Sequence, residues 1–207
     1  MLFRKMQNVM RLGISSAVNN VYEWYVRRRL KNKDFTILCS NCIGGIIYHR
    51  LGMQFLSPTI NLWMRQRDCI KLAANINNYR RHKLQFVESE YPYPVAKLDD
   101  IMIYFNHSID EASAADGWYR RIDRINEDNI YLILYDREDL TDEEIMNLED
   151  LPCKRCILLT EKERSHIKFA KKMVPSGKPN GKQYLDRRWH GLHTFETQFD
   201  FVSWLNQ

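Results

Sequence analysis

The sequence lacks an apolar run of the roughly 18 residues that a membrane-spanning helix needs. Its N-terminus also lacks the apolar core of an export signal. Several motifs of common enzyme classes are missing as well, since there is no P-loop, no GxGxxG, no HExxH and no GxSxG. We therefore expect a cytoplasmic protein whose chemistry, if it has any, does not use these familiar arrangements.

Cysteine is scarce and odd in number, with five residues in the chain. An odd count without an export signal argues against a disulfide scaffold. Two CxxC pairs occur, Cys39/Cys42 and Cys153/Cys156. Four-cysteine zinc sites place such pairs roughly 15–20 residues apart, and these pairs are much further apart. In a parallel sheet they would also lie at opposite edges, so we expect no metal and no other cofactor.

Acidic residues are nearly absent from the first 33 positions, where eight Lys and Arg stand against Glu23 alone. This segment therefore carries a charge of +7, out of a net charge of +5 for the whole chain, and the remainder carries −2. A body close to neutral gives no support for a nucleic-acid partner.

What is present is a chain of 207 residues with 44% hydrophobic residues, enough for one sizeable core. Short apolar runs alternate with amphipathic segments, which predicts an α/β three-layer sandwich with a mostly parallel central sheet. We expect a basic amphipathic helix over 1–33, followed by a single α/β domain over 34–207. The predicted strands are Phe35–Cys39, Ile101–Asn106, Ile130–Tyr135 and Cys156–Thr160, and helices are expected over 110–126, 161–171 and the C-terminal residues.

The long N-terminal helix has two interpretations. Its apolar residues recur at helical spacing, and the basic run RRRLKNK follows them. One interpretation is a peripheral contact with an anionic membrane surface. The other is packing against its own domain or against the second copy of a homodimer.

The stretch Phe35–Ser57 reads as a buried strand, a polar turn and a helix that begins near Gly44 and Gly45. This geometry places Cys42 at unpaired backbone N–H groups, which lower the pKa of a thiol. His107 follows another predicted strand, and in a parallel sheet both residues would reach the same edge. Cys42 would be the nucleophile and His107 its base, with Asn41 or the N–H groups of the glycines stabilising an oxyanion. The alternative is a small buried cysteine in a tight turn and a structural histidine.

A second constellation recurs along the segment 110–126. Trp118, Arg121 and Arg124 are spaced by three residues. Arginine binds phosphate or carboxylate through two parallel hydrogen bonds, and tryptophan offers a face for stacking. The set therefore predicts a clamp for an anionic ligand. The alternative is a surface helix with ion pairs and a tryptophan in the core.

Five stretches are distinctive in combination: FTILCSNCIGGIIYHRLGMQFLSPTINL, YPVAKLDDIMIYFNH, WYRRIDRIN, NIYLILYDRED and FDFVSWLN. Together they resemble the bacterial family known as domain of unknown function 1919, whose members are often labelled exopolysaccharide-biosynthesis proteins. The resemblance covers about 34–206 and implies an α/β fold and a role near surface-glycan synthesis, but no reaction. The family's motif positions fall here on Asn41, Cys42, Gly44, Gly45, Ser57, Pro58, His107, Trp118, Arg121, Arg124 and Asn126, so the resemblance adds Ser57 and Asn126 as ligand-binding candidates.

Two functions from different classes follow. The first is a Cys–His thiol hydrolase or transferase that acts on a glycan precursor or another anionic small molecule. The second is a non-catalytic module that binds an anionic sugar or phosphate within a polysaccharide-synthesis system. A plain structural role for the cysteine, histidine and arginines is the third possibility.

Overall fold

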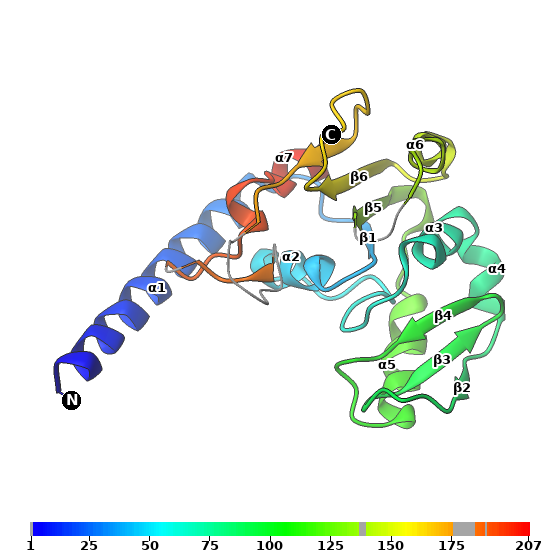
Figure 1. Cartoon of the computed structure of the whole chain (residues 1–207), viewed down its shortest axis with the longest axis horizontal. Coiled ribbons are helices and arrows are strands. Elements are labelled where there is room, and N and C mark those ends of the chain that lie inside the picture. The colour runs from blue at the N-terminus through cyan, green and yellow to red at the C-terminus, as the bar shows by residue number, and fades with distance from the viewer. Residues whose placement is uncertain (1, 137–139, 176–184, 189) are drawn as a thin grey trace. The chain divides into compact units, whose positions relative to one another are not determined.

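The computed structural model describes residues 2–136, 140–175, 185–188 and 190–207, with side chains from residue 13 onward (Figure 1). The described chain forms two compact units. One unit comprises 1–33, 49–53 and 173–207, and the other comprises 34–48 and 54–172.

The larger unit holds a parallel four-stranded sheet in the order β1-β5-β6-β7. Its strands are β1 (Thr36–Cys39), β5 (Ile130–Tyr135), β6 (Arg155–Thr160) and β7 (Ala170–Lys172). Every residue of β1 and β5 is buried. Parallel strands covered on both faces need such continuous burial, which is why their sequences run apolar without alternation. The predicted α/β class with a largely parallel sheet is confirmed.

A second, antiparallel sheet in the order β2-β3-β4 corrects the expectation of one central sheet. It contains β2 (Gln85–Val87), β3 (Val95–Leu98) and β4 (Ile101–Tyr104). The predicted strand at Ile101–Asn106 exists, but as β4 it pairs with β3 through a two-residue turn. Asp99 in that turn has φ +55°, a conformation that hairpin turns of this length require and that Asp tolerates.

Seven α-helices complete the described chain. They are α1 (Leu2–Arg29), α2 (Ile43–Leu51), α3 (Gln66–Ala74), α4 (Ile76–Arg81), α5 (Glu111–Ile122), α6 (Asp142–Met146) and α7 (Phe201–Leu205), and three 3₁₀ turns are η1 (Glu127–Asn129), η2 (Asn147–Asp150) and η4 (Phe195–Thr197). Capping boxes at Asp110 and Thr141 start α5 and α6.

The helix expected over 161–171 is wrong, because this stretch forms turns before β7. Arg164 is 9% exposed and pairs with Asp136 at 3.2 Å and also with Asp142. These two ion pairs join Arg164 to residues more than 20 positions away in the sequence. They fix the position of its backbone, which the local sequence pattern does not show.

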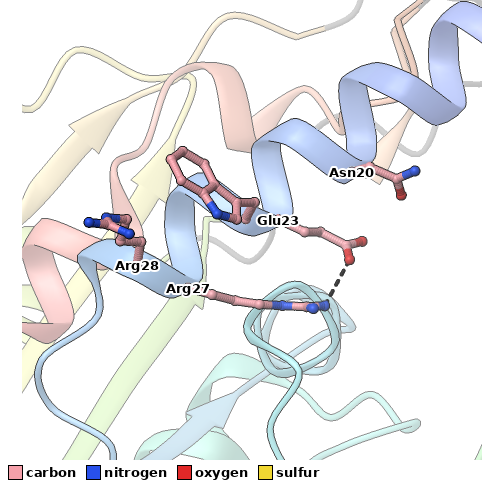
Figure 2. A pocket seen from close by; sticks show the side chains of 5 residues that line it. Asn20, Glu23, Arg27 and Arg28 are labelled. Atoms are coloured by element: carbon pink, nitrogen blue, oxygen red, sulfur yellow. Dashed lines mark hydrogen bonds and ion pairs between the residues drawn. The ribbon is translucent and has the colours of Figure 1, made fainter.

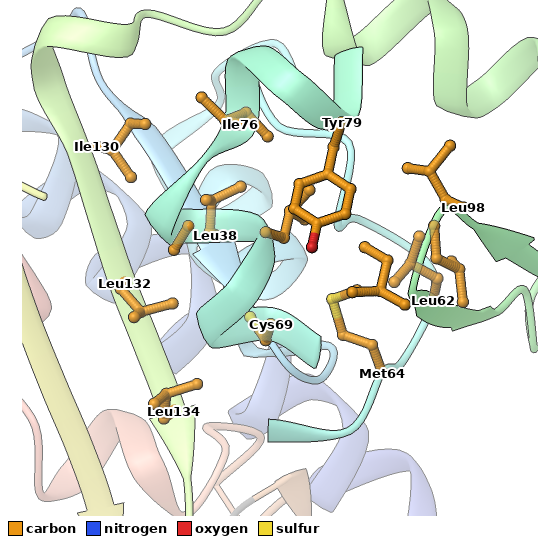
Figure 3. Close-up of a cluster of buried hydrophobic side chains, with 14 of the residues drawn as sticks. Leu38, Leu62, Met64, Cys69, Ile76, Tyr79, Leu98, Ile130, Leu132 and Leu134 are labelled. Carbon is orange, nitrogen blue, oxygen red and sulfur yellow. The ribbon is translucent and has the colours of Figure 1, made fainter. Parts of the chain in front are cut away.

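The core of the larger unit joins both sheets through α3 and α4. Leu38, Leu132 and Leu134 of the parallel strands face Cys69 on α3, while Tyr79 on α4 lies near Leu98 of the hairpin (Figure 3). These helices therefore fix the antiparallel hairpin against the parallel sheet by apolar contact.

The smaller unit is held by a buried ion pair. Arg50, 5% exposed, donates to both carboxylate oxygens of Glu196 at 2.7 and 3.1 Å and to Glu23 of α1 at 3.2 Å. Asn206 then donates to the carbonyl of Arg29, at the end of α1, at 2.9 Å. Segments far apart in sequence thus close one unit around α1.

Candidate functional site

Cys42 lies at the N-cap of α2, immediately after the turn that follows β1. Its carbonyl accepts the hydrogen bond of Ile46 N–H at 3.1 Å, the first turn of the helix. Asn41 fixes this turn, since its side-chain oxygen accepts from Ile43 N–H at 2.9 Å. The thiol of Cys42 is half-buried and lies at the start of the helix, the end at which the helix dipole is positive.

His107 reaches the same place by a route that the sequence did not suggest. The segment Trp63–Met64 acts as a bridge between the two sheets. Trp63 exchanges two backbone hydrogen bonds of 3.0 Å with Tyr104 of β4, and Met64 N–H donates to the carbonyl of Ser40 at 3.2 Å. The end of β4 is thereby tied to the end of β1.

This bridge places the two candidate side chains in contact. Cys42 Sγ lies 3.5 Å from His107 Nε2. His107 is exposed and Cys42 is half-buried, so a reacting group has access to the pair. A thiol within hydrogen-bond reach of an imidazole is the minimal arrangement for nucleophilic catalysis by cysteine.

No carboxylate among the described residues hydrogen-bonds the His107 ring, so the pair is a dyad. Asp110, which follows it closely, instead caps α5 by accepting from Ser113 N–H at 2.8 Å. That hydrogen bond lowers the pKa of the Asp110 carboxyl. The side-chain oxygen of Asn41 accepts hydrogen bonds at the helix start, so its NH₂ group is the part that would donate to an oxyanion.

The other cysteine of the pair, Cys39, occupies a very different environment. It is fully buried at the end of β1, and its thiol donates to the Asn41 side-chain oxygen at 3.1 Å. Burial raises the pKa of this thiol to about 12. Cys39 therefore serves packing and the turn, and is not a nucleophile at neutral pH.

Gly44 and Gly45 let α2 approach its neighbours closely. A Cβ at Gly44 would lie 3.3 Å from both Cys39 Cβ and Ile37 Cγ2, and one at Gly45 would lie 3.3 Å from Ile60 Cγ2. The α-carbons of both glycines thus serve packing. Any role in binding falls to their backbone N–H groups.

Ser57 is fully buried beneath β1. Its hydroxyl lies 3.1 Å from Thr59 Oγ1, which in turn accepts from Cys39 N–H at 3.0 Å. This chain of hydrogen bonds satisfies a strand N–H that has no strand partner on that side. Ser57 thus stabilises β1 indirectly, through its hydrogen bond with Thr59.

Trp118 is also fully buried, and its ring packs edge-on against Phe105 at a centroid distance of 6.4 Å. A ring enclosed by the core has no face left on which a ligand could stack. The stacking part of the expected anion clamp is therefore not available at Trp118.

Arg121 and Arg124 lie at the far end of α5 from His107. Arg124 Nη1 is 3.4 Å from the carbonyl oxygen of Phe55. The carbonyl oxygen of the next residue, Leu56, accepts a hydrogen bond from Thr36 Oγ1. Thr36 is the first residue of β1, whereas Cys42 follows the last. The structure thus separates the arginines from the thiol–imidazole pair.

Asn126 belongs to the same end of β1. Its backbone N–H donates to Thr36 Oγ1 at 2.9 Å, and its side-chain oxygen accepts from Asp128 N–H at 3.1 Å, at the start of η1. These bonds make it part of the framework at the amino end of the sheet.

Arg121 itself is half-buried with incomplete hydrogen bonding. Its Nε is buried and has no hydrogen-bond partner in the described part of the chain. The guanidinium lies over Gly117, where a Cβ would be 3.0 Å from Nη2. Burial lowers the pKa of Arg121, and the neighbouring charges of Arg120 and Arg124 lower it further.

Two features near the dyad were missed from the sequence. Asn106, the neighbour of His107, has a buried side-chain oxygen without a hydrogen-bond partner in the described chain. An aromatic cluster also adjoins the bridge, with Trp63 stacked on Tyr104 at 3.8 Å and donating to Tyr93 at 3.1 Å. Tyr91 completes the cluster and is 40% exposed. The run YPYP before β3 was the available signal.

Among the side chains that the structure describes, no three His, Cys, Asp or Glu lie close enough together to hold a metal ion. Cys153 precedes β6 and Cys156 is the second residue of that strand, whereas Cys42 follows the last residue of β1. The described cysteines of the two pairs form no group of three.

Comparison with known proteins adds one family and one relative. Residues 14–206 match the family model described as a domain of unknown function, DUF1919. The chain is also 33% identical over 199 residues to an uncharacterized protein of Haemophilus influenzae, covering 93% of this chain and 96% of that protein. Neither description names a reaction.

Proposed function

Because the chain belongs to the family of the domain of unknown function DUF1919, whose description names no reaction, we propose its function from the geometry at Cys42. We propose a thiol-dependent hydrolase or transferase with Cys42 as nucleophile and His107 as base. The observation that carries this proposal is the distance of 3.5 Å between Cys42 Sγ and His107 Nε2, at the start of a helix.

The proposed reaction is acyl transfer. His107 Nε2 accepts the thiol proton, and Sγ attacks the carbonyl carbon of an acyl group. The oxyanion that forms faces the backbone N–H groups at the start of α2. As the bond from carbon to the leaving group breaks, His107 returns the proton to that group. Water or an acceptor hydroxyl then attacks the thioester, His107 takes its proton, and Sγ leaves as the thiol.

The proposed substrate is an acylated precursor of a surface glycan. This assignment follows the family resemblance and is supported by the surroundings of the dyad. Tyr91 and Trp63 offer aromatic surface, and the electron-rich faces of such rings attract the polarised C–H groups of a sugar.

Alkylation by iodoacetamide at pH 7, followed residue by residue by mass spectrometry, tests the dyad. We expect Cys42 to react before the other four cysteines. His107→Gln should slow Cys42 at least about tenfold, given the factor of 10² or more typical of general-base assistance. His82→Gln, at a partly exposed histidine of the same unit, is the matched control and should change nothing.

Turnover is tested separately with p-nitrophenyl acetate, whose acyl group would give a burst of one p-nitrophenolate per Cys42. Cys42→Ala should abolish the burst. If Cys42 is alkylated no faster than Cys153, or if His107→Gln leaves its rate unchanged, the dyad is not functional and the enzyme proposal fails.

A second candidate function, binding of an anionic sugar or phosphate without catalysis, is favoured by Arg121. Arg121 and Arg124 are close enough for their charges to interact, and two neighbouring guanidinium groups suit a phosphate. This candidate locates the ligand at the amino end of β1, away from Cys42.

Thermal unfolding in the presence of glucose 1-phosphate distinguishes this candidate. A ligand at ten times its Kd stabilises the folded state by about 1.4 kcal/mol. We expect that stabilisation to vanish in Arg121→Gln and to persist in Arg120→Gln, since Arg120 is exposed and pairs with Asp116 at 3.4 Å. Equal shifts in both variants would exclude Arg121 as the binding group.

A further inference from the structure

Helix α1 carries its large apolar side chains on the outside. Val21 is 66% exposed, Trp24 62%, Tyr25 48% and Ile14 47%. At 100° per residue, Ile14, Val21 and Tyr25 fall within about 40° of one another on the helix surface. Arg28 lies within about 40° of Ile14 on the same side.

The inward side of the same helix mixes polar residues with the buried Val26, and Leu30 directly after the helix is buried too. Ser15 and Asn19 are half-buried, and they pack so closely on Gly191 that a Cβ there would lie 2.1 Å from Ser15 Oγ. Glu23 turns toward Arg50. A surface helix normally buries its apolar stripe and exposes its polar face. This segment buries Val26 and Leu30 and also exposes a second apolar stripe, which indicates that the outward stripe meets something other than water.

Positive charge accompanies the exposed stripe. The Arg28 guanidinium lies 5.6 Å from the centre of the Trp24 ring, and Lys31 and Lys33 are exposed just beyond the helix end. Around Trp24 the helix lines a hollow of about 520 Å³, in which Arg27 pairs with Glu23 at 2.7 Å (Figure 2). Glu23, the one acidic residue of the first 33, is thus already engaged.

We propose that α1 lies in the interface of an anionic lipid membrane, with Val21, Trp24 and Tyr25 at the boundary between headgroups and acyl chains. Exposed tryptophan, aliphatic side chains and flanking arginine and lysine are the composition of such helices. None of the described helices combines the length and apolar character that crossing a bilayer requires. The helix would therefore lie along the surface. This proposal does not depend on any reaction at Cys42.

Charge argues for lipid over a second copy of the chain. Basic residues occur near both ends of the segment, with Arg4, Lys5 and Arg11 at one end and the run from Arg27 to Lys33 at the other. A parallel or an antiparallel pair of these helices would place basic residues against basic residues. An anionic lipid surface complements both ends at once.

Co-sedimentation of the full chain with lipid vesicles tests the proposal. Phosphatidylcholine vesicles are compared with vesicles containing 30% phosphatidylglycerol, in 50 mM and 500 mM NaCl. We expect binding to the anionic vesicles only, and weaker binding in high salt. The double variant Val21→Ser with Trp24→Ser should bind at least tenfold more weakly. Ile109→Ser, at a residue 95% exposed in the other unit, is the matched control and should bind as the natural chain does.

The double variant Arg28→Glu with Lys31→Glu tests whether positive charge contributes to vesicle binding. It also keeps the proposal testable if the variant Val21→Ser with Trp24→Ser does not fold. Each basic side chain near an anionic surface contributes about fivefold to partitioning, so at least about a 25-fold loss is expected. Absence of binding to anionic vesicles in 50 mM NaCl would overturn the proposal. So would a dimer in sedimentation velocity that Val21→Ser with Trp24→Ser dissociates.

Discussion

The two ends of β1 are both rich in polar residues, but they are used differently. At the amino end, Thr36, Asn126, Asn129 and Asp34 hydrogen-bond to one another or to nearby backbone. At the carboxyl end, the Cys42 thiol faces the exposed His107 ring at 3.5 Å. The polar groups at the amino end are hydrogen-bonded within the protein and stabilise the fold. At the carboxyl end the thiol and the imidazole remain accessible, as expected at the edge where α/β folds bind ligands.

The largest expected difference is between the two cysteines at the carboxyl end. At pH 7 a thiol with a pKa of about 12, as burial gives Cys39, is ionised over a thousandfold less than an unperturbed thiol of pKa about 8.5. We therefore expect iodoacetamide to label Cys42 at least about 10³ times faster than Cys39 in the folded protein.

The pH dependence sharpens this prediction. Cys39 gains thiolate only as the pH approaches its raised pKa, so its labelling in the folded protein should stay negligible below about pH 9. In urea both cysteines should react alike. Comparable labelling rates for Cys39 and Cys42 in the folded protein would contradict this prediction. They would show that the turn between the two cysteines opens readily and exposes Cys39.

The next largest effect concerns the glycine at the start of α2. Gly44→Ala should lower the free energy of unfolding by about 1–2 kcal/mol, because the new Cβ would press on Cys39 and Ile37 in a buried strand. Urea unfolding measures this change. Gly13→Ala, with nothing within 4 Å of the added Cβ on α1, is the control. It should raise stability by about 0.5–1 kcal/mol. Similar gains in both variants would mean that the close approach of α2 to β1 is not needed.

The smallest effect should come from the amino end. Asn126→Ala removes the side-chain acceptor for Asp128 N–H and should lower the free energy of unfolding by about 1 kcal/mol. The rate of Cys42 alkylation should not change, because Asn126 supports the opposite end of the strand. Slower alkylation of Cys42 in this variant would show that the amino and carboxyl ends of β1 are coupled. It would contradict the separation of Asn126 from the thiol–imidazole pair.

Much of the fold was readable from the sequence, because fully buried parallel strands leave continuous apolar runs such as Ile130–Tyr135. The hairpin was harder to recognise. Its strands β2 and β3 are short, β3 carries an exposed lysine, and two prolines precede it. The pairing of β3 with β4 across Asp99 and Asp100 was not predicted. The buried position of Arg164 depends on long-range ion pairs, which leave no local pattern.

In the candidate site, too, features set by local sequence could be predicted from it, and features set by long-range contacts could not. Local sequence correctly indicated that Cys42 stands at a helix start, because turn and helix signals lie within a few residues. Its contact with His107 depends on the bridge at Trp63–Met64, which links the sheets through a few backbone hydrogen bonds and has no side-chain signature. Spacing along α5 grouped Trp118 with Arg121, but spacing does not reveal that the core encloses Trp118.

The ion pair between Arg50 and Glu196 has a consequence for synthesis of the chain. Helix α1 leaves the ribosome long before Glu196 and Asn206, the residues that anchor it. The strands of the parallel sheet are complete by Lys172 and can assemble earlier. The side of α1 that holds Val26, with Leu30 directly after it, therefore stays uncovered during most of synthesis, until the segment with Glu196 and Asn206 is made.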